Sequence, residues 1–271
     1  VCEKVSYMKN FAVLNKLVSD LTFLAGREDK RILCLANLRQ QKNHIRLLEA
    51  FEIIKNKYPD WSLHCVGKDF KDAYSELFFS KVKTLNLKED VYFYDSRSDI
   101  LNIMKQCNIG LLISKSEGLP LALLEYGIAK LPVISTDVGN CGMLISDESL
   151  GVLLNTDNKQ EVADAIIYYI ENEKYMKSSA SNFNTKIKNE YSGDVILKDI
   201  LGISFLEEPD ERFFSNYWLT TILIDPKKTG GIIREKVRLE FEKHNIESRP
   251  LWKPMHLQPV FKDCPAYTNG V

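Results

Sequence analysis

Short apolar runs alternate with helix-like patterns between Arg31 and about Leu154, and this alternation constrains the fold more than any other feature of the chain. Strands and helices at this spacing predict a parallel sheet with right-handed crossovers and helices on both faces. Nearly continuous apolar runs such as I-G-L-L-I-S agree, because the strands of a parallel sheet are buried on both faces. The expected strands cover residues 32–36, 61–67, 91–94, 109–114, 132–136 and 151–154.

The segments between these runs carry apolar residues at helical spacing. Such faces are expected around positions 47–58, 100–104 and 162–170, and a polar helical segment over 173–200 is expected to close the domain. We therefore predict an α/β fold, a Rossmann-like doubly wound parallel sheet that binds its ligands at the carboxyl ends of the strands.

The pattern changes at about Gly202. Residues 215–226 are typical of a long strand, rich in β-branched and aromatic residues and stopped by Pro226. A helix is expected over 231–244, followed by a proline-rich extended run. We predict two domains, residues 1–201 and 202–271, of which the second is a small α+β appendage.

Charge and cysteine usage exclude several classes of protein. The chain of 271 residues has a net charge of −1 and no basic block, so no nucleic-acid partner is expected. Six cysteines and four histidines are scattered without C-x-x-C or metal spacing. This argues against a metal site or a disulfide frame, favours a reducing, cytoplasmic compartment, and makes His64 a hydrogen-bonded core residue. No apolar run approaches the roughly 20 residues that span a bilayer, so membrane association is expected to be peripheral at most.

Residues 114–137 read S-K-S-E-G-L-P-L-A-L-L-E-Y-G-I-A-K-L-P-V-I-S-T-D and hold two glutamates eight positions apart, Glu117 and Glu125. A polar turn with Gly118 and Pro120 follows an expected strand and leads into a helical pattern and a second strand. A helix that starts at the carboxyl end of a parallel strand offers free N–H groups to an anion, commonly a diphosphate. Two solvated surface glutamates are the alternative, and the flanking turn and strands favour the binding site.

With that motif, the sequence resembles the retaining, GT-B type glycosyltransferases of family 4, whose signature is E-x7-E. The resemblance covers about residues 30–200 and includes R-I-L-C-L-A-N-L-R-Q-Q-K-N-H, similar to the first strand and phosphate loop of the family's donor-binding domain. It implies that Glu125 binds the ribose of a nucleotide-sugar, Glu117 lies by the sugar as the catalytic position, and Lys42 reaches the diphosphate. The donor-binding residues that it implies are Asn37, Arg39, Lys42, Gly118, Leu119 and Glu125.

One position departs from that family. A family arginine just after the first strand is Asn37 here, and Arg39, two residues on, does not restore a planar bidentate guanidinium at the same place. Lys42 could instead be a solvated lysine at a helix start, but its register with both glutamates favours a phosphate role. Gly139, Asn140 and Gly142 form a turn that either approaches the donor or serves as a connector.

Residues 203–271 resemble the small carboxyl-terminal domain of the DegT/DnrJ/EryC1/StrS sugar aminotransferases. The N-Y-W-L-T strand and the run S-R-P-L-W-K-P-M-H-L-Q-P-V-F carry this resemblance. That family's Schiff-base lysine lies in its large domain, before the segment present here. Pyridoxal phosphate is therefore not expected to bind, no other cofactor is expected, and His256 is expected to be structural or idle.

The two resemblances imply a retaining glycosyltransferase of surface polysaccharide biosynthesis, of which this chain is the donor-binding half with a UDP- or GDP-linked sugar as ligand. The acceptor domain is expected before residue 1, and a glycan or lipid-linked glycan acceptor only when that domain is supplied. Two alternatives stay open for the chain by itself: a non-catalytic nucleotide-sugar-binding module, and an inactive fusion relic with an aminotransferase-like tail. No Ser-His-Asp set, Walker loop or G-x-G-x-x-G is present, which argues against a hydrolase, a P-loop NTPase or a dinucleotide oxidoreductase.

Overall fold

The computed structural model describes residues 21–155, 157–192, 195–196, 202–205, 222–243 and 248. The chain divides into two compact units, residues 1–196 and 197–271. The expected division at residues 201 and 202 stays a prediction, because positions 197–201 lie outside the described part.

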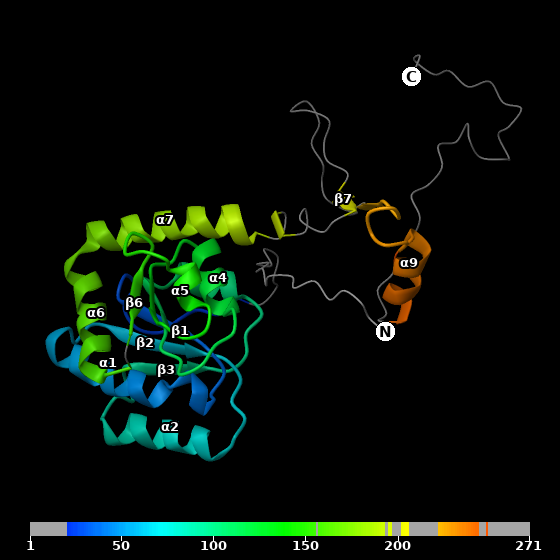
Figure 1. Ribbon diagram of the computed structural model, residues 1–271. Helices are drawn as coiled ribbons and strands as arrows, with labels where there is room; N and C mark the ends of the chain where they lie inside the picture. Colours follow the sequence, from blue (N-terminus) through cyan, green and yellow to red (C-terminus); the bar gives the residue numbers. More distant parts are fainter. Residues whose placement is uncertain are drawn as a thin grey trace, which may run out of the picture. The chain divides into compact units, whose positions relative to one another are not determined.

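The first unit is built on six parallel strands in the order β3-β2-β1-β4-β5-β6. The chain first adds strands on one side of β1 and then returns to add β4, β5 and β6 on the other side (Figure 1). This is the doubly wound arrangement that the sequence predicts, and its direction reverses between β1 and β4. The strands are β1 Arg31–Leu35, β2 Ser62–Val66, β3 Val91–Tyr94, β4 Ile109–Leu112, β5 Val133–Thr136 and β6 Val152–Leu154.

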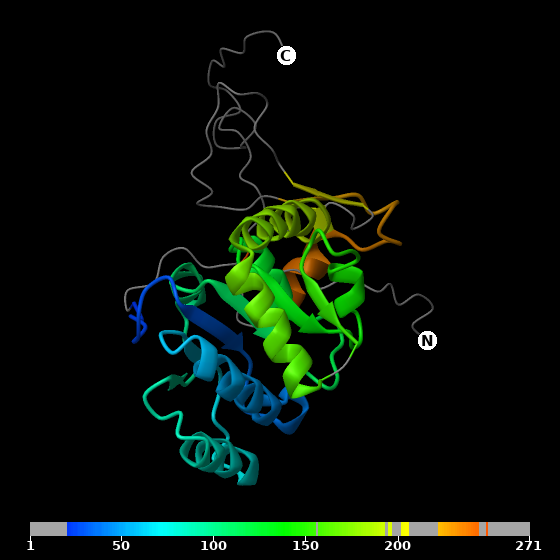
Figure 2. The ribbon, with the colours of Figure 1, turned by 90° about the vertical axis from the view of Figure 1, so that its left-hand side faces the viewer.

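Helices cover both faces of the sheet (Figure 2). One face carries α1 His44–Lys57, α2 Ala73–Thr84 and α6 Lys159–Glu171. The other carries α3 Ile100–Lys105, α4 Leu121–Ile128, α5 Cys141–Leu144 and the second half of α7 Glu173–Tyr191. None of the described helices is both long and apolar enough to cross a membrane.

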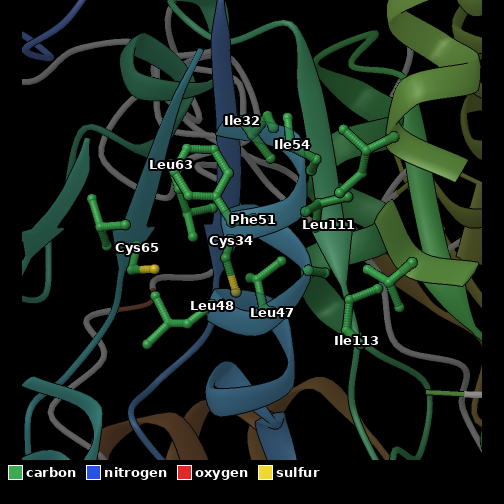
Figure 3. Packing of buried hydrophobic residues seen from close by; sticks show 14 of the residues in the cluster. Ile32, Cys34, Leu47, Leu48, Phe51, Ile54, Leu63, Cys65, Leu111 and Ile113 are labelled. Atoms are coloured by element: carbon green, nitrogen blue, oxygen red, sulfur yellow. The ribbon is translucent and has the colours of Figure 1, made fainter. Parts of the chain in front are cut away.

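Each face of the sheet has its own apolar core, because side chains alternate between the faces along a strand. Ile32 and Cys34 of β1 belong to the core beneath α1, whereas Leu33 between them belongs to the core beneath α4. Figure 3 shows the first of these cores, where Phe51 of α1 is packed among strand side chains. Burying a side chain of this size contributes about 1.5–3 kcal/mol, so this interdigitation holds α1 on the sheet.

A buried tyrosine fixes α4 to the end of β1. The Tyr126 hydroxyl accepts a hydrogen bond from the Leu35 backbone N–H at 2.7 Å, and its single proton is shared between the carbonyls of Leu33 and Leu111 at 3.4 and 3.3 Å. On the outer side of α4, the Asn184 side chain of α7 donates to the Gly127 carbonyl at 2.7 Å. Helix α4 is therefore held from the sheet and from α7, which fixes the position of Glu125 within it.

The second unit contains a two-stranded antiparallel sheet and a helix among its described residues. Strand β7 Ile203–Phe205 pairs with β8 Ile222–Ile224, and α9 covers Arg234–Lys243. Helix α9 lies within the helix predicted over 231–244. Of the long strand predicted over 215–226, residues 222–224 are described as a strand, whereas 215–221 and nearly all of the proline-rich run lie outside the described residues.

Candidate functional site

Two loops meet at the carboxyl edge of the sheet, where its strand order reverses. After β1 the chain forms the short 3-10 helix η1 Gln40–Lys42, and Asn43, in the left-handed region at φ 57°, turns it into α1. After β4 comes the turn S-K-S-E-G-L-P, which leads into α4. The backbone N–H of Lys115 donates to the Gln41 carbonyl at 2.7 Å, so the two loops are directly joined.

Lys42, Glu117 and Ser114 form one polar cluster between these loops. Lys42 Nζ lies 2.6 Å from Glu117 Oε1, and the Ser114 hydroxyl donates to the same oxygen at 2.5 Å. The Glu117 side chain is only 8% exposed and that of Lys42 21%. The Thr136 hydroxyl of β5 in turn donates to the Ser114 carbonyl at 2.6 Å. The Glu117 carboxylate is thus oriented, directly or through Ser114, by groups from β5 and from the loops after β1 and β4, three neighbouring strands of the sheet.

The turn after β5 packs directly on the Glu117 turn. The Asn140 N–H donates to the Gly118 carbonyl at 2.9 Å. Gly139 has a φ of +58°, and a Cβ added there would lie 2.0 Å from the Glu117 carbonyl oxygen. Only glycine therefore fits at position 139 without moving the Glu117 backbone. The turn thus packs on the Glu117 turn, and its approach to the donor stays a prediction.

Glu125 is the fifth residue of α4, and its side chain is half-buried. No described residue gives its carboxylate a hydrogen bond or an ion pair, and burial raises the pKa of Glu125. A partly desolvated carboxylate without a partner is destabilised until a donor reaches it. Its chemistry therefore suits a ligand that brings hydroxyl groups to α4.

The remaining predicted site residues lie in three different surroundings. Asn37 Oδ1 accepts a hydrogen bond from the Lys68 N–H at 2.8 Å, and the Arg39 guanidinium lies 4.4 Å from the centroid of the Phe70 ring. Both residues are thus engaged with the loop after β2. Gly118 is exposed, with no atom within 4 Å of an added Cβ, whereas Leu119 is buried in the core beneath α4.

The sequence predicts that Lys42 and Glu117 lie at the carboxyl edge of the sheet, but it does not predict the residues that orient them. Ser114 and Thr136 are not among the predicted site residues, although Ser114 opens the motif. The available signal is that each follows or ends an expected strand on the ligand-binding edge. Among the described residues, no group of three or more His, Cys, Asp and Glu side chains is arranged to hold a metal ion.

Residues 23–188 match the family model of glycosyl transferases group 1. This match covers more than half of the chain, and the chain belongs to that family.

Curated relatives agree with this assignment. An uncharacterized glycosyltransferase of Haemophilus influenzae is 28% identical over 185 residues, which make up 66% of this chain and 50% of the relative. A UDP-Gal:alpha-D-GlcNAc-diphosphoundecaprenol alpha-1,3-galactosyltransferase of Escherichia coli is 28% identical over 160 residues, 58% of this chain and 41% of the relative. The chain thus spans about half the length of these glycosyltransferases.

One further relative belongs to a different class of enzyme. EpsN of Bacillus subtilis, a putative pyridoxal phosphate-dependent aminotransferase, is 40% identical over 55 residues. The match covers 20% of this chain and 13% of the relative.

Solved structures share the fold of the first unit. The C-terminal domain of a group 1 glycosyl transferase, LpcC from Francisella tularensis, has a TM-score of 0.57 at 24% identity, covering 61% of this chain and 88% of that one. HepE of Anabaena, in complex with UDP, has a TM-score of 0.60 at 22% identity, covering 64% of this chain and 48% of that one. At these identities the likeness shows the GT-B type fold of the domain.

Proposed function

We propose that the first unit binds a nucleotide-sugar, with UDP or GDP as its nucleotide, at the carboxyl edge between β1 and β4. The observation that carries this proposal is the unpaired, half-buried Glu125 on the helix that follows the Glu117 turn. Its carboxylate would accept hydrogen bonds from the ribose hydroxyls. Such a bond to a charged group contributes about 1.5–3 kcal/mol, which offsets the cost of burying the carboxylate.

The diphosphate would be held by Lys42 and by the first turn of α4. An ammonium group has three donors, and in the free protein the contact with Glu117 uses one of them. Pro120, the residue before α4, provides no side-chain cap, which leaves N–H groups of the first turn for an anion. Positive charge from Lys42 and the helix terminus would stabilise the charge that develops on a leaving nucleoside diphosphate.

Within a complete enzyme, this unit would act as the donor half of a retaining glycosyltransferase of surface polysaccharide assembly. Support comes from the relatives: the E. coli protein is named as a galactosyltransferase that uses UDP-Gal and a diphosphoundecaprenol-linked sugar, and HepE binds UDP. We carry over the donor class from both, and a lipid-linked acceptor only for a protein that also holds an acceptor domain. Glu117 would then lie next to the transferred sugar.

The second unit is proposed to derive from the small domain of a sugar aminotransferase. The short match to EpsN supports this origin. We propose no transaminase activity for it, because its resemblance leaves out the segment that carries the Schiff-base lysine.

Calorimetric titration of the chain with UDP and with GDP tests the proposed function. We expect saturable binding of one nucleotide per chain, with one of the two bases preferred. Incubation with the matching labelled nucleotide-sugar then separates a binding module from a catalyst, because only a catalyst releases free sugar. Absence of saturable binding of both nucleotides to the folded chain would contradict the proposal.

A further inference from the structure

The loops after β1 and β2 are hydrogen-bonded to one another along the carboxyl edge of the sheet. Ala36 N–H donates to the Val66 carbonyl at 2.9 Å, and Leu38 N–H donates to the Lys68 carbonyl at 3.0 Å. The Lys68 N–H returns a hydrogen bond to Asn37 Oδ1 at 2.8 Å. These hydrogen bonds continue the pairing of β1 with β2 into the loops. The backbone positions of the residues in both loops are therefore fixed relative to one another.

Two cations from these loops lie over the same aromatic ring. Arg39 Cζ is 4.4 Å and Lys68 Nζ 5.2 Å from the centroid of the Phe70 ring. Arg39 and Lys68 are exposed and Phe70 is half-buried. We call these three residues the Arg39–Lys68 patch.

No carboxylate among the described residues pairs with either cation. The acids nearest in sequence are instead engaged by backbone N–H groups: Asp69 Oδ1 accepts from Lys71, Asp72 Oδ1 from Tyr74 and Ser75, and Asp95 Oδ1 from Ser96. The patch differs in this respect from Lys42, whose charge is met by Glu117. It is therefore a positive site without a neutralising partner, on the ligand-binding edge of the sheet.

The physical consequence is an affinity for anions. Two like charges over one ring repel each other, and the negative face of the ring compensates only part of that repulsion. An anion bound by both cations would remove it. A guanidinium offers a planar fork of donors and an ammonium a compact point charge, which together suit the spread oxygen atoms of a diphosphate.

We propose that the Arg39–Lys68 patch binds a diphosphate group. The inference rests on the proposed function for the choice of diphosphate rather than another anion. Two sources share this chemistry: the donor's own diphosphate, and the diphosphate of a lipid-linked acceptor. The second source makes the patch an acceptor subsite carried by the donor-binding domain.

The test uses the full chain and its variant Arg39→Gln/Lys68→Gln, which keeps both side chains long while removing their charges. The variant Lys83→Gln/Lys88→Gln removes two other exposed lysines, for which no described residue provides an ion pair, and serves as the charge-matched control. Binding of inorganic pyrophosphate, UDP and farnesyl diphosphate is measured at constant ionic strength. Far-UV circular dichroism and thermal unfolding confirm that each variant is folded.

The proposal expects the Arg39→Gln/Lys68→Gln variant to bind pyrophosphate at least about tenfold more weakly than the wild type, and the control to stay within about twofold. A parallel loss for UDP identifies the donor as the source. A loss for farnesyl diphosphate with unchanged UDP affinity identifies the acceptor. Phe70→Leu keeps both charges but removes the ring that positions them, and a partial loss is expected.

Unchanged affinity for all three probes in the folded Arg39→Gln/Lys68→Gln variant, or equal losses in the control, would contradict the proposal that the patch binds a diphosphate. A wild type that binds pyrophosphate through the patch but does not bind UDP would instead refute the proposed function and leave this inference standing. The two failures are therefore distinguishable in one set of titrations.

Discussion

Lys42 Nζ lies 2.6 Å from Glu117 Oε1, although 75 positions separate the two residues along the chain. The lysine ends the turn after β1 and the glutamate lies in the turn after β4, and these strands are neighbours at the point where the sheet changes direction. A crevice opens at such a point because the two connecting segments run to opposite faces of the sheet. The ion pair thus marks the part of this fold in which a ligand is expected.

Replacing Lys42 with alanine is predicted to weaken UDP or GDP more than the matching nucleoside, because the ammonium addresses phosphates. We expect a loss of about 1.5–3 kcal/mol for the diphosphate and little change for uridine or guanosine, measured by calorimetry. Equal losses for nucleotide and nucleoside would show that Lys42 acts on the fold or on the base.

The same substitution leaves the Glu117 carboxylate, 8% exposed, without its cation. Breaking a largely buried pair from one side is costly, so Lys42→Ala is also expected to lower the free energy of unfolding. The double variant Lys42→Ala/Glu117→Gln removes both charges and is expected to recover most of that stability without recovering nucleotide affinity. This control separates the binding role from the structural one.

Most of the fold could be predicted because its strands are short and mostly apolar, and those at the centre of the sheet are buried on both faces. Helix α2 was missed, since its exposed side includes Leu77 and Phe79 and its apolar residues do not mark a single face. Helix α5 has four residues, too few to show a period.

The candidate site was predicted only in part, because sequence spacing shows some of its residues and tertiary contacts define the others. Glu117, Glu125 and Lys42 follow strands at recognisable spacing. The roles of Ser114 and Gly139 depend instead on contacts with Glu117, which only the folded structure shows. Nothing in the sequence near Gly139 shows that the Glu117 carbonyl will lie against it. The stacking of Arg39 on Phe70 is likewise a contact between separate loops.

Gly139→Ala is predicted to destabilise the first unit by about 1–3 kcal/mol, because the new Cβ meets the Glu117 carbonyl oxygen and a φ of +58° is strained for alanine. Gly118→Ala, one residue past Glu117, is the matched control, since nothing lies within 4 Å of its added Cβ. Chemical denaturation of both variants makes the comparison. A Gly139→Ala variant as stable as Gly118→Ala would show that this turn is not fixed against Glu117.

His64 is predicted to make the protein less stable as the pH falls. It is buried between Tyr92 and Tyr94, at ring distances of 5.3 and 5.8 Å, and its Nε2 contacts the Ser62 hydroxyl at 2.9 Å. Burial, aided by the charge of Arg31, lowers the pKa of His64 from 6.5 to about 3. Between these values the unfolded chain binds a proton that the folded chain does not, so stability falls as the pH drops below 6.5.

From pH 7.5 to pH 5 this residue alone is expected to remove about 2 kcal/mol from the free energy of unfolding. His64→Gln lacks the titrating group, so the stability difference between wild type and variant should shrink by that amount over the same range. Denaturant titrations at both pH values measure it. A difference that stays constant with pH would contradict a neutral, buried His64.

The second unit is predicted not to bind pyridoxal phosphate. Covalent capture of this cofactor needs a desolvated lysine aimed at its aldehyde. The described lysines of this unit do not provide one: Lys227 and Lys228 are in an exposed turn, Lys236 of α9 is exposed, and Lys243 of α9 pairs with Glu240. Incubation with the cofactor should therefore give no stoichiometric internal-aldimine absorbance after dialysis. A persistent band that one tail lysine substitution abolishes would refute this prediction.

The central claim is that Glu125 receives the ribose of a nucleotide-sugar. Calorimetry of UDP and GDP binding to the wild type and to Glu125→Ala tests it most directly, with Glu76→Ala, an exposed glutamate of α2, as the control. We predict that Glu125→Ala loses about 1–3 kcal/mol of nucleotide binding while remaining folded, and that the control loses none. We also predict that a 2′,3′-dideoxy nucleotide binds wild type and Glu125→Ala equally. Unchanged affinity for the normal nucleotide in the folded Glu125→Ala variant would contradict the account.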